Sequence, residues 1–389
     1  MLNILLLGLT SLLTDFSSEM VLPILPFFIQ SLGGGGIAIG LIFGVGDAVA
    51  AVLKVFSGHI ADRTRRYKFL VFLGYAFSAI AKFGYLVSAS LASVALVRPI
   101  ERMGKGFRDA PRDAIVSESL DSLDRGKAFG IQRAMDSVGA ILGSVAILVF
   151  FLHYGLTFYT IFLASALLGL VGLIPVLFVQ VPSHLAIENR KIVSLKKLSR
   201  PLKQFVTIGT LFALATFSYA FLILQAQKSF HGLDQHRSLE LALIIYIFFN
   251  FFDAVLSGPA GALSDRIGRK TVILLGYMSF ALVSLGFLAL TLFQVTNTVT
   301  FAVLIILFMF YGFHKALIDA AQRAYVSDLS DPGIRGTALG TFDTFTGLAA
   351  IPAGLIAGLF WNISPMYTFA YGFILSVVSL VLLIQFKEH

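Results

Sequence analysis

The chain has 389 residues, of which 57% are hydrophobic and 13% charged, with a formal net charge of +8 and no cysteine. Soluble globular proteins carry about 25% charged residues, so this composition excludes an ordinary soluble domain, and the missing cysteines exclude disulfides and thiolate metal sites. The apolar residues come in continuous runs of about twenty, the length at which a helix crosses a bilayer, and such continuous runs exclude a membrane β-barrel.

Twelve of these runs are long enough to cross a membrane as helices, so we predict an all-α integral membrane protein. In chain order they cover 3–30, 37–58, 69–90, 92–117, 127–152, 156–180, 204–228, 239–261, 271–293, 299–327, 336–360 and 365–386. The first run lacks a basic leading region and contains two carboxylates, so we interpret it as a retained span rather than a cleaved signal peptide. Pro23 and Pro26 remove helix hydrogen bonds and predict a bend in it.

Lysine and arginine gather in every second loop of this arrangement. The loop after the second run, the segment 181–203 and the loop after the eighth run are basic, whereas the loops on the other side carry few such residues. Cytoplasmic loops carry the excess of Lys and Arg, so we predict that both termini are cytoplasmic. The positive charge is then a membrane anchor, and we expect no nucleic-acid partner.

The two halves of the chain repeat each other. "GHIADRTRRYKFLVFLGY" (58–75) is similar to "GALSDRIGRKTVILLGY" (261–277), and 105–130 is similar to 315–340, with Lys105 matching Lys315. Six spans separate the copies, so the repeat is parallel, an architecture of transporters whose substrate site lies near the midplane. We predict an N-terminal six-helix bundle over 1–180, a cytoplasmic linker loop over 181–203, and a C-terminal six-helix bundle over 204–389.

A motif after the second span and again after the eighth resembles the signature of the major facilitator superfamily. Its residues are Gly58, Asp62, Arg63 and Arg66 in the first copy and Gly261, Asp265, Arg266, Gly268, Arg269 and Lys270 in the second. The first copy has Arg65 where the family usually has glycine. The resemblance implies the fold of that superfamily, a transport function, and a gating role in which the motif steadies the outward-facing state. From their positions, Asp62 and Asp265 are also expected to cap the following helices.

Two further stretches look like those of a subgroup of bacterial members described as drug or metabolite exporters. They are "TDFSSEM" in the first span and "GKGFRDAPRDA" in the fourth. Gly130, Gly139 and Gly143 have the spacing of the antiporter motif of the family, with Ser144 where proline is expected. This resemblance implies efflux by antiport in a bacterial inner membrane. Close helix packing is the alternative role of these glycines.

The fourth span concentrates charge on one helix face. Arg98, Arg102, Lys105, Asp109 and Arg112 recur at steps of three and four, which places them together. A charged side chain at the bilayer centre costs about 2.5–3.5 kcal/mol on insertion scales, so such groups face partners or water. We therefore predict that this face lines an aqueous route. For the residues from Arg108 onward, the alternative is that they snorkel at the cytoplasmic end.

Carboxylates on the first two spans are candidates for proton coupling. Asp15 and Glu19 lie four residues apart on one helix face, and Asp47 lies in the second span. Burial and a nearby arginine act in opposite directions on the proton affinity of a carboxyl, so such a group can take up and release a proton during transport. A static ion pair with Arg98 or Arg102 is the alternative. We predict a substrate cavity lined by polar and charged residues of several spans: Arg98, Arg102, Lys105, Arg133, Asp136, Gln225, Asn250 and Asp253.

These features predict a monomeric secondary transporter that works by alternating access. We expect proton-coupled export of small amphipathic organic molecules, with the bilayer, the substrate and protons as its partners. The alternatives are proton-coupled uptake of an organic anion, such as a siderophore or a carboxylate, and a membrane receptor without flux. The sequence has no nucleotide-binding loop, metal-ligand cluster or nucleophile constellation, so we predict no enzymatic activity, no metal and no cofactor.

Overall fold

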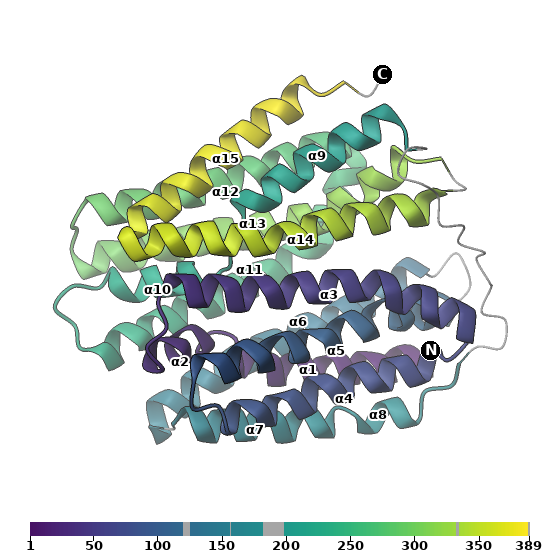
Figure 1. Cartoon of the computed structure of the whole chain (residues 1–389), viewed down its shortest axis with the longest axis horizontal. Helices are drawn as coiled ribbons and strands as arrows, with labels where there is room; N and C mark the ends of the chain where they lie inside the picture. Colours follow the sequence, from purple (N-terminus) through teal and green to yellow (C-terminus); the bar gives the residue numbers. More distant parts are fainter. Residues whose placement is uncertain (120–124, 156, 182–197, 332–333, 388–389) are drawn as a thin grey trace. The chain divides into compact units, whose positions relative to one another are not determined.

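The computed structural model describes residues 1–119, 125–155, 157–181, 198–331 and 334–387, and for 125–127, 151–153 and 320 it describes the backbone alone. Apart from one short 3₁₀ turn, every regular element in these ranges is an α-helix (Figure 1). The first helices are α1 (Leu2–Val21), α2 (Leu25–Ser31), α3 (Gly36–Thr64), α4 (Tyr67–Leu86), α5 (Leu91–Ser117), α6 (Arg125–Tyr154), α7 (Phe158–Val171) and α8 (Ile174–Leu177). They are followed by α9 (Arg200–Ala215), α10 (Ala220–Lys228), α11 (Gln235–Ile267), α12 (Arg269–Leu292), α13 (Asn297–Asp328), α14 (Arg335–Ile363) and α15 (Pro365–Gln385).

Three of the predicted spans consist of two consecutive helices each. The first span is interrupted between Val21 and Leu25, where Pro23 lies, so the predicted bend is confirmed. The span over 156–180 is divided into α7 and α8, with Pro175 at the start of α8. The span over 204–228 is divided into α9 and α10 at residues 216–219.

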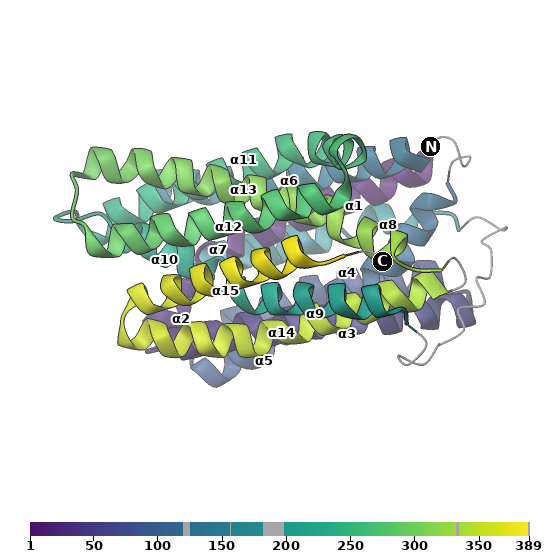
Figure 2. The same ribbon diagram turned by 90° about the horizontal axis from the view of Figure 1, so that it is seen from above.

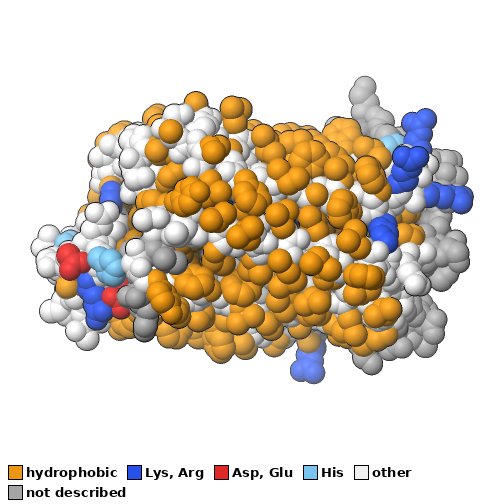
Figure 3. Space-filling model, turned by 90° about the horizontal axis from the view of Figure 1, so that it is seen from below, with side chains coloured by type: hydrophobic (Ala, Val, Ile, Leu, Met, Phe, Trp, Pro, Cys, Tyr) orange, Lys and Arg blue, Asp and Glu red, His pale blue; other side chains and the backbone are white. Residues whose placement is uncertain are grey.

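The membrane-spanning character predicted from the apolar runs is confirmed. Eleven helices or helix pairs of the described chain are long and apolar enough to cross a membrane. The remaining predicted span forms the helix α5, whose charged residues keep it outside that group. On the face drawn in Figure 3, hydrophobic side chains form a broad belt and most of the visible charged side chains lie at its two ends.

The described residues fall into two compact units. The first takes in Met1–Gly34 and Val45–Asn189, and the second takes in Gly35–Gly44 and Arg190–His389. In the first unit α1 packs on α6 and α7, and α4 packs on α5 and α7. In the second unit α13 packs on α11 and α12, while α15 contacts α9, α12 and α14 (Figure 2). Most of the predicted linker over 181–203 lies outside the described residues.

Glycines bring the beginning of α3 into close contact with α14 within the second unit. The amide of Gly36 donates a hydrogen bond of 2.6 Å to Oδ1 of Asn362. A Cβ atom placed on Gly40 would overlap the carbonyl group of Gly354, and a Cβ on Gly354 would overlap Gly40 in turn. The two backbones therefore touch directly, an approach that only glycine permits at these positions.

The predicted capping role of the two motif aspartates is wrong. Asp62 and Asp265 lie in the last turns of α3 and α11, and the helices that follow begin without a side-chain cap. The connection instead turns through residues with positive φ, which are Arg65 at 56° and Gly268 at 89°. The first copy therefore uses an arginine in the left-handed region where the second copy has glycine, which costs on the order of 1 kcal/mol.

Candidate functional site

The helix α5 carries the charged residues of the candidate site and lies very close to its neighbours in the first unit. Ser90 begins it with a capping box, in which its side chain accepts a hydrogen bond from the amide of Ser93. A Cβ atom on Gly104 would overlap Gly74 of α4, and one on Gly106 would lie 2.7 Å from the carbonyl oxygen of Ala50 in α3. These close contacts bring the charged side chains of α5 against α1, α3 and α4.

Arg98 and Glu101 form the most deeply buried ion pair of the site. Nη1 of Arg98 lies 2.8 Å from Oε2 of Glu101, and the two side chains are only 2% and 5% exposed. The hydroxyl of Tyr85 in α4 donates a second hydrogen bond of 2.7 Å to the same oxygen. Glu101 is off the charged stripe predicted from the sequence, and it pairs with Arg98 three residues earlier in the same helix.

Arg102 connects α5 to α3. Its Nη2 lies 2.8 Å from Oδ1 of Asp47, and the side chains are 22% and 44% exposed. Both residues were predicted to belong to the site, Asp47 as a proton-coupling group and Arg102 as part of the substrate cavity. The structure places them in contact, which is the arrangement of the predicted static pair.

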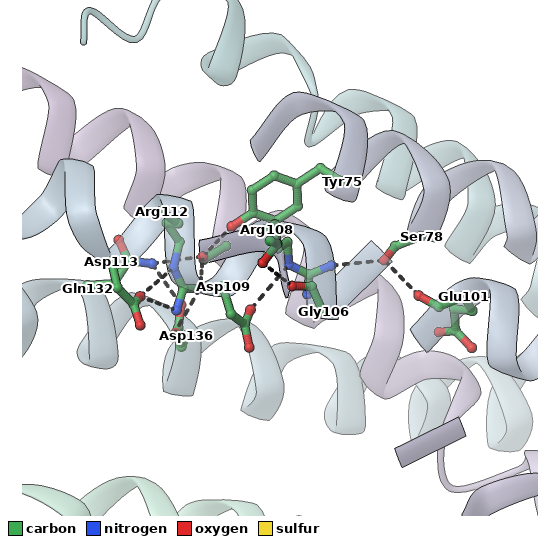
Figure 4. Close-up of polar contacts among 12 residues, drawn as sticks. Tyr75, Ser78, Glu101, Gly106, Arg108, Asp109, Arg112, Asp113, Gln132 and Asp136 are labelled. Atoms are coloured by element: carbon green, nitrogen blue, oxygen red, sulfur yellow. Dashed lines mark hydrogen bonds and ion pairs between the residues drawn. The ribbon is translucent and has the colours of Figure 1, made fainter. Parts of the chain in front are cut away.

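Arg108 is held by neutral groups of α4 (Figure 4). Its Nη1 donates a hydrogen bond of 2.9 Å to Oγ of Ser78, and its guanidinium carbon lies 4.5 Å from the centre of the Tyr75 ring. The contact between its Nε and Oδ1 of Asp109 is longer, at 3.9 Å. Because Arg108 is buried, it is fixed inside the bundle rather than snorkelling toward the membrane surface.

Arg112 is the centre of a polar network that reaches α1 and α6 (Figure 4). It lies 3.0 Å from Asp113 and 4.0 Å from Asp136, and it donates a hydrogen bond of 3.1 Å to Oγ of Ser11. Gln132 of α6 joins the same groups, because its amide donates to Ser11 at 2.7 Å and to Asp136 at 3.1 Å. The network ties the end of α5 to both neighbouring helices.

Lys82 is a buried cation that the sequence analysis missed. It is fully buried in α4, and its ammonium donates hydrogen bonds to the hydroxyls of Ser17 and Ser18 in α1, the second at 3.0 Å. Ser17 in turn donates to the carbonyl oxygen of Ser165 in α7. The signal was present in the sequence as a lysine inside the third apolar run, which by itself marks a membrane-buried charge as a candidate for function.

Asp15 differs from the other carboxylates of the first unit. Among the described residues it makes no hydrogen bond and no ion pair, and its side chain is half-buried. The charged groups that act most strongly on it are Arg108, Lys105 and Arg112 of α5, followed by Glu19. Lys105 is exposed and likewise makes no ion pair within the described part of the chain. Arg98 and Arg102, the partners expected from the sequence, are therefore not among the charged groups that act most strongly on Asp15.

The remaining predicted residues of the first unit lie on α1 and α6. Glu19 is half-buried where α1 meets Gly143, and Asp136 belongs to the Arg112 network, while Arg133 is exposed on α6. Gly139 and Gly143 let α6 approach α1, since a Cβ on either would come within 2.5 Å of a backbone oxygen of α1. A Cβ on Gly130 would meet no atom of the described part of the chain within 4 Å. Close packing therefore accounts for two of the three motif glycines.

The predicted cavity residues of the second unit form a smaller polar group. Oδ2 of Asp253 in α11 lies 3.1 Å from Nζ of Lys315 in α13, and this ammonium also lies 5.3 Å from the centre of the Phe249 ring. Asn250 is buried one turn before Asp253. Gln225 is buried in α10 and donates a hydrogen bond of 3.2 Å to Ser229, which is a local contact within the core.

The residues of the predicted gating motif lie at the ends of helices. Arg269 pairs with Asp265, at 3.6 Å, and with Asp328 at the end of α13. In the first copy Oδ1 of Asp62 accepts a hydrogen bond of 2.9 Å from the hydroxyl of Tyr67. Gly58 is buried, Gly261 is half-buried, and Arg63, Arg66 and Arg266 are exposed. Within the described residues, no group of three His, Asp or Glu side chains is placed to hold a metal ion.

Comparison with known proteins identifies the family. The profile of the Major Facilitator Superfamily matches residues 7–251 and 207–389. The MFS-type transporter MJ1317 of Methanocaldococcus jannaschii is 45% identical over 385 residues, which cover 98% of this chain and 94% of that protein. The multidrug resistance protein MdtH of Proteus mirabilis is 27% identical over 144 residues, 35% of this chain and 34% of that protein.

A solved transporter structure has the same fold as this chain. The crystal structure of the nucleoside transporter NupG superposes with a TM-score of 0.78 at 17% sequence identity, covering 99% of this chain and 98% of that one. At this identity the likeness concerns the fold alone. The chain therefore belongs to the Major Facilitator Superfamily, as its paired motifs predicted, and it is a membrane transporter rather than an enzyme.

Proposed function

We propose that this protein is a proton-coupled secondary transporter that exports small amphipathic organic molecules by alternating access. The single observation that carries the proton coupling is the position of Asp15. It is a half-buried carboxylate in a membrane-spanning helix that has no hydrogen bond or ion pair among the described residues. Arg108, Lys105 and Arg112 act on it from α5. A carboxylate without a fixed partner, with cations nearby, can exchange a proton when water reaches it from either side.

Export is favoured over import by the partial likeness to the multidrug resistance protein MdtH. The exporter-like stretches of the first and fourth spans agree with it. In this proposal the protein lies in the cytoplasmic membrane as a monomer with both termini on the cytoplasmic side, and the gating motif controls the change between its outward-facing and inward-facing states.

Uptake of an organic anion is the second candidate function. It is supported by Lys105, an exposed ammonium in α5 that has no ion pair among the described residues. Such a group can attract the carboxylate of a substrate without first breaking an existing salt bridge.

Transport into inside-out membrane vesicles with an imposed pH gradient tests the proposal. We expect accumulation of the lipophilic cation ethidium, with Asp15→Asn abolishing the accumulation driven by the gradient while the protein stays folded in the membrane. Asp331→Asn, at an exposed position outside the spans, is the matched control and should transport normally. Gradient-driven transport that survives Asp15→Asn would refute the role of Asp15.

The direction of transport is tested with the same vesicles. If ethidium does not accumulate but benzoate leaves the vesicles with protons, the uptake proposal replaces export, and we then expect Lys105→Gln to weaken benzoate transport. Binding of either compound without any counterflow in proteoliposomes would favour a receptor and contradict both transport proposals.

A further inference from the structure

An apolar groove runs between α9 and α14 in the second unit, and its lining includes none of the charged residues of the candidate site. Its volume is about 540 Å³, and the lining includes Lys203, Val206, Thr210, Leu214, Thr341 and Phe345. The volume lies in the range of about 300–1,000 Å³ typical of pockets for small organic molecules. Both helices belong to membrane-spanning segments and pack side by side (Figure 1). The groove therefore lies along the part of the chain expected to cross the bilayer.

The polar side chains inside the groove already have hydrogen-bond partners within the protein. The hydroxyls of Thr207, Thr210 and Thr341 donate hydrogen bonds to carbonyl oxygens one turn back in their own helices, at 3.0, 2.7 and 2.8 Å. A ligand does not have to satisfy these groups, and a polar ligand would lose its own hydrogen bonds to water there. The interior of the groove therefore fits a hydrocarbon chain.

One end of the groove is basic. Lys203 lines it in the first turn of α9, and Arg200 lies three residues earlier on the same helix face. Arg200 is exposed and makes no ion pair within the described ranges. Because α9 is part of a membrane span that begins at Arg200, these two side chains lie at the boundary of the bilayer. Basic residues in this position attract anionic lipid headgroups.

We propose that the groove binds an anionic phospholipid of the surrounding membrane, with an acyl chain between α9 and α14 and the phosphate beside Arg200 and Lys203. The charge at one end and the apolar wall beyond it match the two parts of such a lipid. A transported substrate fits less well, because substrate sites orient their ligand with several polar groups, and among the described residues of the lining Lys203 alone is charged. The inference is independent of proton coupling and of the direction of transport.

The test uses the full-length protein in nanodiscs of phosphatidylcholine with a minor fraction of phosphatidylglycerol. Native mass spectrometry then measures how much phosphatidylglycerol the released protein retains. Arg200→Gln with Lys203→Gln removes the basic end, and Thr210→Trp fills the groove. Lys387→Gln, an exposed basic residue near the end of α15, and Leu282→Trp, on the exposed side of α12, are the matched controls. Thermal unfolding in detergent checks that every variant is folded.

We expect the double variant to weaken phosphatidylglycerol binding by about 25-fold, since each basic residue near an anionic surface contributes about fivefold. Thr210→Trp should remove the bound lipid, and both controls should retain it. Equal retention of phosphatidylcholine and phosphatidylglycerol by the unmodified protein would overturn the proposal, as would unchanged retention in the two groove variants. A Thr210→Trp protein that keeps its lipid but loses substrate transport would assign the groove to the substrate and overturn it as well.

Discussion

The guanidinium of Arg102 in α5 lies 2.8 Å from the carboxylate of Asp47 in α3, and the second unit contains a related pair one helical turn further along. The internal repeat matches Asp47 with Asn250 and Lys105 with Lys315, so Arg102 corresponds to Gly312. The pair in the second unit is Asp253 with Lys315, three residues later in both helices. The second and fourth spans of a unit run in the same direction, so a contact between them can lie one turn further along both helices and still join them. Each unit therefore has an ion pair between its second and fourth spans.

A double-mutant cycle tests the link between Arg102 and Asp47. We expect Arg102→Gln and Asp47→Asn each to lower the free energy of unfolding, and the double variant to lower it by less than the sum. The coupling should be about 0.2–1 kcal/mol, because Asp47 is 44% exposed and water screens the pair. Chemical unfolding in detergent measures the four proteins. Strict additivity would mean that the contact contributes no stability.

The pair of Arg98 and Glu101 should contribute far more to stability. Its side chains are 2% and 5% exposed, so Glu101→Gln leaves a buried guanidinium without its countercharge. Loss of one partner of a buried ion pair destabilises a protein by about 3–5 kcal/mol. Thermal unfolding in detergent should show a large decrease in Tm. The control is Glu240→Gln, whose partner Arg237 is 57% exposed and should cost less than about 1 kcal/mol. Equal effects of the two substitutions would contradict the expectation.

Substitution of Lys82, unlike that of Glu101, should not destabilise the protein. Among the described residues its ammonium donates hydrogen bonds to the neutral hydroxyls of Ser17 and Ser18 and forms no ion pair, so Lys82→Met removes a buried charge without breaking a salt bridge. We expect the free energy of unfolding to stay the same or to rise by about 1–2 kcal/mol. Gradient-driven transport should fall at least tenfold, because Lys82 is hydrogen-bonded to Ser17 and Ser18 in α1, the helix that carries Asp15. Vesicle transport and thermal unfolding, measured on the same preparation, give both results.

Lys82→Arg is the matched control because it keeps the positive charge. It should retain more transport than the methionine variant. A methionine variant that transports normally would show that Lys82 only connects α1 to α4, and one that fails to fold would show that the charge is needed for assembly.

The contact between Gly354 and Gly40 predicts a strong effect of a single methyl group. A Cβ on Gly354 would overlap the backbone of Gly40, so neither side has a flexible group that can move away. We expect Gly354→Ala to lower the free energy of unfolding by about 1–3 kcal/mol, the usual cost of overpacking. Gly258→Ala is the control, since a Cβ there meets nothing within 4 Å, and it should be neutral or slightly stabilising. Similar Tm values for both variants would contradict the direct backbone contact.

The sequence was sufficient for the membrane-spanning helices because lipid leaves few alternatives. A run such as 271–293 must satisfy its backbone hydrogen bonds internally, so its helix follows from composition and length alone. The prolines of the first span likewise located the interruption between α1 and α2. The repeated motif around Asp62 and Asp265 identified the family, although the capping role inferred for these two residues was wrong.

The partners of the charged residues depended on packing between helices. Spacing along α5 predicted Arg98, Arg102 and Arg112 on one face, but it gave no information on which helix lies opposite each of them. Glu101 is off that stripe, and the structure shows it as the buried partner of Arg98 three residues earlier in the same helix. Lys82 was missed because it is the one charged residue of its apolar run, 69–90, and neither a motif nor the repeat marks it.

The sequence by itself determined that this chain crosses a membrane repeatedly, that its halves are related and which family it belongs to, because these properties follow from hydrophobic runs and local motifs. Only the tertiary structure decided that Arg102 contacts Asp47, that Lys82 binds two serines and that Asp15 has no fixed partner among the described residues. The first two are contacts between different helices, and the third depends on which side chains surround α1. The rotation and depth of these helices are set by close packing at glycines such as Gly104 and Gly143, which a pattern within a single helix does not encode.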